Sequence, residues 1–245
     1  GGPEGYVDRS GKIIVAPQFE SAGYFSEGLA YVQFGGKYGF IDEAGKMVIA
    51  PQFEDASPFR HGRSRVRVKG KYGFIDEAGK MVIEAKYDSA WTFGDELTGV
   101  CVEDKWGCVD RTGKVVIEIK YGKIYWFSEG LAAARLEGKY GFLDRTGKWA
   151  IEPQFADAVR FSCGRAMVRE KEDGPYGYIH RSGKWIVRPE YEWATHFQEG
   201  LARVRVKLKY GYIDVSGKVV IAAEHEAAGD FSEGVAAFCK DGKYG

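Results

Sequence analysis

The sequence predicts an all-β fold built from seven short repeats, and three observations support this. The twelve residues from Tyr38 to Ile49 return unchanged from Tyr72 to Ile83, and looser copies fill the rest of the 245-residue chain. A fixed period of about 34 residues indicates a solenoid, a propeller or an array. Aromatic residues are 15% of the chain and glycines number 34, which favours short strands and tight turns, and no helical spacing is sustained.

The period is measured from the first glycine of each copy. Successive intervals are 34 residues, with a single interval of 36. The repeats begin near Gly5, Gly39, Gly73, Gly107, Gly141, Gly177 and Gly211. Because the copies tile the chain with almost nothing left over, we expect a single repeat domain over residues 1–245.

The first half of each repeat predicts a β-hairpin. In the second copy, Gly39-Phe40-Ile41-Asp42 is followed by two variable residues, Gly45-Lys46 and an apolar triplet. Asp accepts backbone N–H groups across such a turn, and glycine supplies its left-handed residue. We expect the lysine to pair weakly with the aspartate across the turn. His180 replaces the aspartate in the sixth copy, where this pair would be weakened or pH-dependent.

The second half predicts further strands around one required aromatic residue. Pro51-Gln52-Phe53 suits the start of an edge strand. An alanine follows in six of the seven copies, and a phenylalanine stands three residues beyond that place in all: Phe25, Phe59, Phe93, Phe127, Phe161, Phe197 and Phe231. We expect this phenylalanine to plug the core between neighbouring units. An alternating strand follows, as in residues 201–207.

These elements predict a closed, seven-bladed β-propeller with three or four short strands in each blade. No unit buries its apolar face alone, so stacked neighbours must supply the core. Closure is expected from the termini, because residues 4–8 and 243–245 belong to the same segment of the repeat. Joining them would remove exposed strand edges and leave a monomer. An open β-solenoid or stack is the alternative.

The complete motif resembles the WG (or KWG) repeat of bacterial proteins. It runs from Lys-(Trp/Tyr)-Gly-Phe-Ile-Asp through Gly-Lys and Pro-Gln-Phe to Phe-x-Glu-Gly-Leu-Ala. Lys105-Trp106-Gly107 is the literal copy, and the other junctions use Tyr-Gly. The resemblance covers the whole chain. It implies a β-rich, propeller-like module and brings no catalytic residues with it.

Charge and composition argue against several partners. Lys+Arg and Asp+Glu both number 35, so the net charge is zero. A basic surface that attracts nucleic acid or an anionic membrane is therefore not expected. No apolar run approaches the roughly 20 residues of a membrane helix, and no signal peptide is visible, so we expect a cytoplasmic protein. The four cysteines form no Cys-x-x-Cys pair.

No catalytic, metal or cofactor motif is present. Residues 39–46 resemble a phosphate-binding loop, but five residues separate the glycines where four are needed, and Met47 follows the lysine in place of Ser or Thr. The four histidines lie in different contexts without metal-ligand spacing. We therefore predict a protein that is not an enzyme and has no metal or cofactor.

A candidate binding surface lies where the copies differ most, in the two residues between the alanine and the required phenylalanine. In a ring these loops would share one face. Trp, Tyr and Arg on adaptable loops are typical of binding hot spots. The candidate binding residues are Tyr24, Trp91, Tyr125, Trp126, Arg160, Trp193 and His196. The competing interpretation is that Trp91, Trp126 and Trp193 fill gaps between units.

Four functions fit these observations. We expect a non-catalytic interaction scaffold that binds a protein or peptide. A carbohydrate-binding, lectin-like propeller would instead present repeated aromatic pockets, whereas the aromatics occur only in some copies. An enzyme would need polar residues converging on a central channel. An engineered repeat protein would have no natural ligand.

Overall fold

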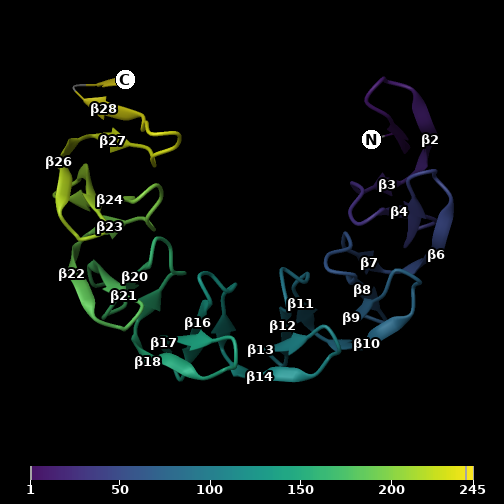
Figure 1. Ribbon diagram of the computed structural model, residues 1–245, viewed down its shortest axis with the longest axis horizontal. Helices are drawn as coiled ribbons and strands as arrows, with labels where there is room; N and C mark the ends of the chain where they lie inside the picture. Colours follow the sequence, from purple (N-terminus) through teal and green to yellow (C-terminus); the bar gives the residue numbers. More distant parts are fainter. Residues whose placement is uncertain (1, 241, 245) are drawn as a thin grey trace. The chain divides into compact units, whose positions relative to one another are not determined.

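The computed structural model describes residues 2–240 and 242–244. In these residues the chain forms the strands β1 to β29 and no helix (Figure 1). It follows that no helix in the described part of the chain is long and apolar enough to span a membrane. Gly245, which belongs to the predicted ring closure, lies outside the described residues.

Six antiparallel sheets of four strands repeat along the chain, each in the strand order of the sequence. We call them sheets A to F. Sheet A contains β3 (Ser21–Ala22), β4 (Leu29–Phe34), β5 (Lys37–Asp42) and β6 (Met47–Phe53). Sheet B contains β7 (Asp55–Ala56), β8 (Ser64–Val68), β9 (Lys71–Ile75) and β10 (Met81–Tyr87). Sheet C contains β11 (Ser89–Ala90), β12 (Leu97–Val102), β13 (Lys105–Asp110) and β14 (Val115–Tyr121).

The second half of the chain continues the pattern. Sheet D contains β15 (Lys123–Ile124), β16 (Leu131–Leu136), β17 (Lys139–Asp144) and β18 (Trp149–Phe155). Sheet E contains β19 (Asp157–Ala158), β20 (Arg165–Arg169), β21 (Tyr176–His180) and β22 (Trp185–Tyr191). Sheet F contains β23 (Trp193–Ala194), β24 (Leu201–Val206), β25 (Lys209–Asp214) and β26 (Val219–His225).

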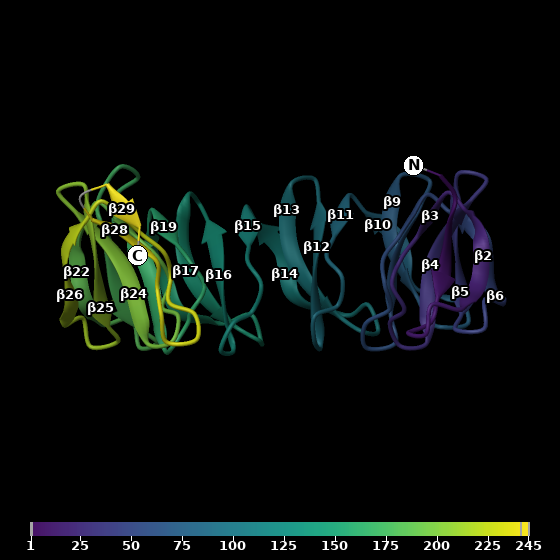
Figure 2. The ribbon, with the colours of Figure 1, turned by 90° about the horizontal axis from the view of Figure 1, so that it is seen from above.

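Smaller sheets stand at the ends. β1 (Glu4–Val7) pairs with β2 (Ile13–Phe19), and β27 (Ala227–Ala228) pairs with β28 (Phe238–Lys240), which pairs with β29 (Lys243–Tyr244). Contacts divide the chain into two compact units, residues 1–120 and 121–245. The single domain and the ring closure therefore stay predictions. Within each unit the loops gather at the two ends of the strands (Figure 2).

The turn between the third and fourth strands follows from an Asp-x-x-Gly-Lys sequence in five of the six sheets. In sheet E His180 replaces the aspartate, and its Nδ1 accepts the N–H of Ser182 at 3.2 Å. In sheet A the Asp42 side chain accepts the backbone N–H groups of Ala44 and Lys46 at 3.0 and 2.9 Å. Gly45 has a φ of +80°, a conformation that glycine adopts without steric cost. Among the described residues no ion pair joins a turn lysine to its aspartate side chain. The aspartate thus stabilises the turn by binding backbone groups.

The required phenylalanine packs between neighbouring sheets, as predicted. Phe59, which precedes β8 of sheet B, is fully buried and meets the ring of Phe40 on β5 of sheet A edge-on at 4.9 Å. Phe161 meets Phe142 in the same way at 4.7 Å between sheets E and D. Each core therefore forms from two adjacent sheets, and a single repeat does not bury its own apolar face.

Candidate binding site

The two variable loop residues after the first strand point in different directions. The backbone of the first residue extends the hydrogen bonding between the first two strands of the sheet. The N–H of Gly23 donates to the carbonyl of Tyr31 at 2.9 Å, and the N–H of Tyr125 donates to the carbonyl of Ala133 at 2.8 Å. The side chain of this first residue therefore stays over the sheet. Successive side chains of an extended chain alternate, so the second residue faces outward. At this place Tyr24 is 59% exposed and Trp126 47% exposed.

Two of the predicted binding residues occupy the inward position and pack against the sheet. The indole of Trp91 stacks on Trp106 with 5.2 Å between centroids and 27° between planes. Tyr125 stacks on Tyr140 at 6.1 Å and 28°. Both are half-buried. Trp91 and Tyr125 therefore pack within their own sheets C and D. Tyr125 also lines a surface hollow described below.

The structure places Trp193 outside the variable loop. It lies in β23, one residue before Ala194, and pairs with Arg205 of β24. Its ring meets Tyr210 edge-on at 5.8 Å, and the guanidinium of Arg203 lies 4.9 Å from its centroid. Trp193 is thus held within sheet F. His196 occupies the outward loop position and is half-buried.

Three of the seven predicted residues come together at one hollow between sheets D and E. This hollow measures about 370 Å³ and is lined by Tyr125, Trp126, Ala158, Val159 and Arg160. The required alanine of sheet E, Ala158, forms a buried floor, and Val159 is the inward loop residue. Sequence reasoning did not include these two residues in the site, although they stand at the alanine position of the repeat and at the variable position that follows it.

The electrostatics of the hollow are positive. Arg160 is exposed, and among the described residues no carboxylate pairs with its guanidinium. The ammonium of Lys123 lies 4.5 Å from the centroid of Tyr125. Burial and a hydrogen bond with Tyr125 raise the pKa of Tyr140 to about 12, so this phenol is neutral at physiological pH. The hollow thus combines apolar walls with one lining cation, Arg160, and no lining acid.

Within the described residues, no three His, Cys, Asp or Glu side chains gather in a way that would hold a metal ion. The hollow also lacks a nucleophile with a neighbouring base. The side chains that line the hollow offer apolar contact through Trp126 and Val159, and hydrogen bonding or charge pairing through Arg160.

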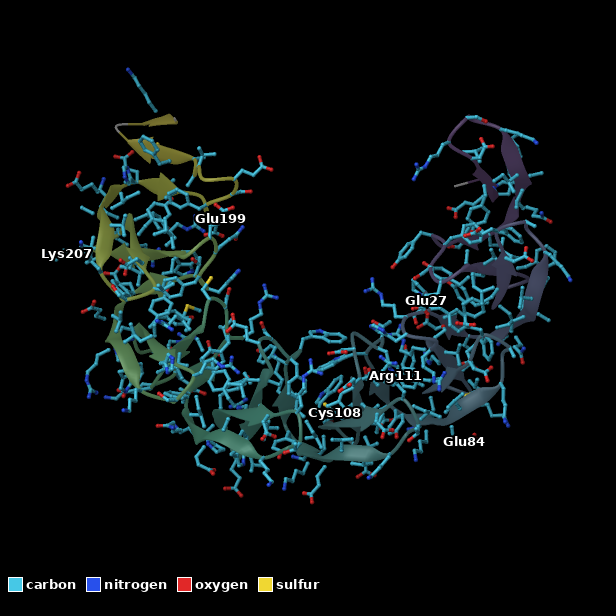
Figure 3. The ribbon with its side chains drawn as sticks, viewed as in Figure 1. Glu27, Glu84, Cys108, Arg111, Glu199 and Lys207 are labelled. Atoms are coloured by element: carbon cyan, nitrogen blue, oxygen red, sulfur yellow. The ribbon has the colours of Figure 1, made fainter. Side chains whose placement is uncertain are left out.

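A second set of inter-repeat contacts lies in the turn after the required phenylalanine. The Glu27 carboxylate accepts the N–H groups of His61 and Gly62 in the next repeat at 2.6 and 2.8 Å. Glu199 does the same for Glu233 and Gly234 at 2.7 and 3.0 Å. Figure 3 labels both glutamates. Sequence reasoning missed this role, because each glutamate and the N–H group that it binds lie 34 residues apart.

Comparisons with known proteins agree with this architecture. The model of the WG containing repeat matches residues 5–38, 38–72, 72–106, 106–140, 140–172, 176–209 and 210–244. A crystal structure of the eukaryotic initiation factor is 12% identical over 86% of this chain and 68% of its own, with a TM-score of 0.55. At this identity the match concerns the fold alone. The chain therefore has a propeller-like repeat fold.

Two further solved structures match with lower scores. Hsv2 of Kluyveromyces lactis is 12% identical over 80% of this chain and 74% of its own, with a TM-score of 0.44. Virginiamycin B lyase from Staphylococcus aureus is 14% identical over 90% and 91%, with a TM-score of 0.39. These scores are too low to support an argument about function. Comparison with the curated proteins finds no match.

Proposed function

This chain belongs to the WG containing repeat family, and we propose that it is a non-catalytic interaction scaffold whose hollow between sheets D and E binds a protein or peptide. The observation that carries the proposal is the apolar hollow with a large exposed indole and an unpaired guanidinium at its rim. The few residues that carry most of the binding energy at protein interfaces are enriched in Trp, Tyr and Arg.

The surrounding scaffold supports this use of the hollow. The floor of the hollow, Ala158, is buried, and one wall, Tyr125, is held by its stack on Tyr140. Both are therefore fixed before a ligand binds. Rigid walls reduce the entropy lost on binding. Trp126 and Arg160 occupy the outward loop positions of adjacent repeats. Because both line the same hollow, one partner segment can contact both.

Mixtures of labelled octapeptides with randomised apolar positions test the proposal by fluorescence anisotropy. We expect Trp126→Ala to weaken binding by about 10-fold or more. Tyr24→Ala is the matched control, because Tyr24 is an exposed aromatic at the same loop position of another repeat. Equal losses in the two variants, or no binding by any mixture, would contradict a peptide site at this hollow.

A carbohydrate ligand is the second candidate, and the exposed indole of Trp126 favours it because sugar faces stack on such rings. A glycan array separates the two. Binding of a neutral glycan that depends on Trp126 and not on Arg160 would favour the lectin-like function. Dependence on both residues favours the peptide.

A further inference from the structure

The first two strands of sheet D carry an unusual cross-strand pair. In sheet B, Asp55 lies opposite Arg67 and its carboxylate is 3.0 Å from the guanidinium of Arg65. In sheet E, Asp157 lies opposite Arg169 and pairs with it at 3.2 Å. At the same register of sheet D, Lys123 lies opposite Arg135. In sheet D two cations therefore lie opposite each other, whereas sheets B and E have an aspartate in the place of Lys123.

Among the described residues, no ion pair joins Lys123 or Arg135 to an acid, in contrast to Arg65 and Arg169. The nearby acids are already engaged: Asp157 pairs with Arg169, and Glu129 accepts the N–H of Gly164 at 3.0 Å. Like charges placed directly opposite each other destabilise a sheet.

Both cations rest on the aromatic stack that supports the hollow. The Lys123 ammonium lies over Tyr125 at 4.5 Å, and the Arg135 guanidinium lies over Tyr140 at 5.7 Å. Tyr125 is also a wall of the hollow, and Arg160 stands at its rim. One cation, Arg160, therefore lines the hollow, and two more, Lys123 and Arg135, lie over the tyrosine stack that forms one of its walls, in a chain whose net charge is zero. The positive charge is a local property of this place.

We propose that the ligand of the hollow is an acidic peptide segment, in which an apolar side chain is flanked by carboxylates. This inference rests on the proposed function and specifies its ligand. The apolar side chain packs against Trp126 and Val159, one carboxylate pairs with Arg160, and another approaches Lys123. The bound peptide supplies the negative charge that Asp55 and Asp157 supply within their own sheets.

The test uses three octapeptide mixtures that share randomised apolar positions and differ in their flanking residues: Glu, Ser or Lys. A labelled oligouridylate is included because phosphates with stacked bases are another anionic ligand. We expect the Glu mixture to bind about 10-fold more tightly than the Ser mixture at low ionic strength. This advantage should shrink as salt screens the charges.

Lys123→Asp copies the acid–arginine pair of sheets B and E. We expect it to raise the melting temperature, to weaken binding of the Glu mixture by about 10-fold and to leave the Ser mixture unchanged. Lys123→Gln removes one charge and should fall between the two proteins. Lys184→Asp is the control, since it makes the same charge change at an exposed residue of sheet E that does not line the hollow.

The outcomes separate the two proposals. Equal binding of the Glu and Ser mixtures, with no effect of Lys123→Asp, overturns the acidic ligand and leaves the peptide function standing. Binding of oligouridylate in preference to every peptide overturns the acidic peptide. Absence of binding by all three mixtures overturns both proposals.

Discussion

The indole of Trp91 lies so close to the backbone of Gly99 that a Cβ on Gly99 would come within 2.5 Å of the ring. Sheet A reverses this arrangement: a Cβ on Gly23 would come within 2.3 Å of Tyr31. In both sheets the N–H of the loop residue donates to the carbonyl of its partner at 2.9 Å. The space over each sheet is therefore filled by a pair of residues, and either strand supplies the large one.

Gly99→Ala should therefore lower the free energy of unfolding by about 1–3 kcal/mol, because the new methyl group displaces Trp91. The double change of Trp91→Gly with Gly99→Tyr copies sheet A and should recover most of that loss. Urea denaturation measures both. A double variant that is less stable than Gly99→Ala would contradict the pairwise filling.

Trp91 and Arg160 should separate stability from binding. Trp91→Ala removes a half-buried ring and should cost about 1–3 kcal/mol of stability, with peptide binding unchanged. Arg160→Ala removes an exposed side chain and should change stability by no more than about 0.5 kcal/mol, with weaker binding. Denaturation and anisotropy on the same preparations check this. Loss of binding in Trp91→Ala at a temperature where it is folded would contradict the assignment.

Cys163 stands where Glu27 and Glu199 stand in their repeats, so its side chain offers no carboxylate to the next turn. Among the described residues, the N–H groups of Glu199 and Gly200 consequently have no hydrogen-bond acceptor. Cys163→Glu should fill this place and add about 0.5–1.5 kcal/mol of stability. Slower hydrogen exchange at Gly200 checks the contact. Cys163→Ala is the control, and an equal gain there would show that the carboxylate is not responsible.

Stability should fall in acid through the turn aspartates. The hydrogen bond from Thr146, together with those from the turn backbone, lowers the pKa of Asp144 below its ordinary 3.8. A lowered carboxyl pKa contributes stability above the unfolded-state value, and this is lost as pH falls through the folded-state value. The loss should therefore appear below about pH 4.

Thr146→Ala should raise the pKa of Asp144 and make stability depend less steeply on pH below about pH 4. Carboxyl NMR titration from pH 2 to 6 measures the first effect, and melting temperature against pH measures the second. Thr112→Ala should act in the same way through Asp110, whose pKa is lowered by the matching hydrogen bond. An unchanged Asp144 titration in Thr146→Ala would show that the hydroxyl is not the cause.

The repeat sequence by itself determined the local structure of this protein. Asp42 and Gly45 specify the turn because their preferences depend on backbone conformation within a few residues. The phenylalanine required in every copy predicted the inter-sheet plug, because an apolar residue at a constant place in an incomplete unit must pack on a neighbour.

Only the tertiary structure decided which variable residues form a site. Whether a loop residue faces inward depends on its pairing with a strand eight residues away, as for Trp91 and Gly99. The contact of Glu27 with His61 and the opposition of Lys123 and Arg135 also join residues that local patterns treat separately. Such contacts arise when sheets pair and pack, so short-range preference predicts the strands and turns, whereas three-dimensional packing selects the exposed side chains that meet at the hollow.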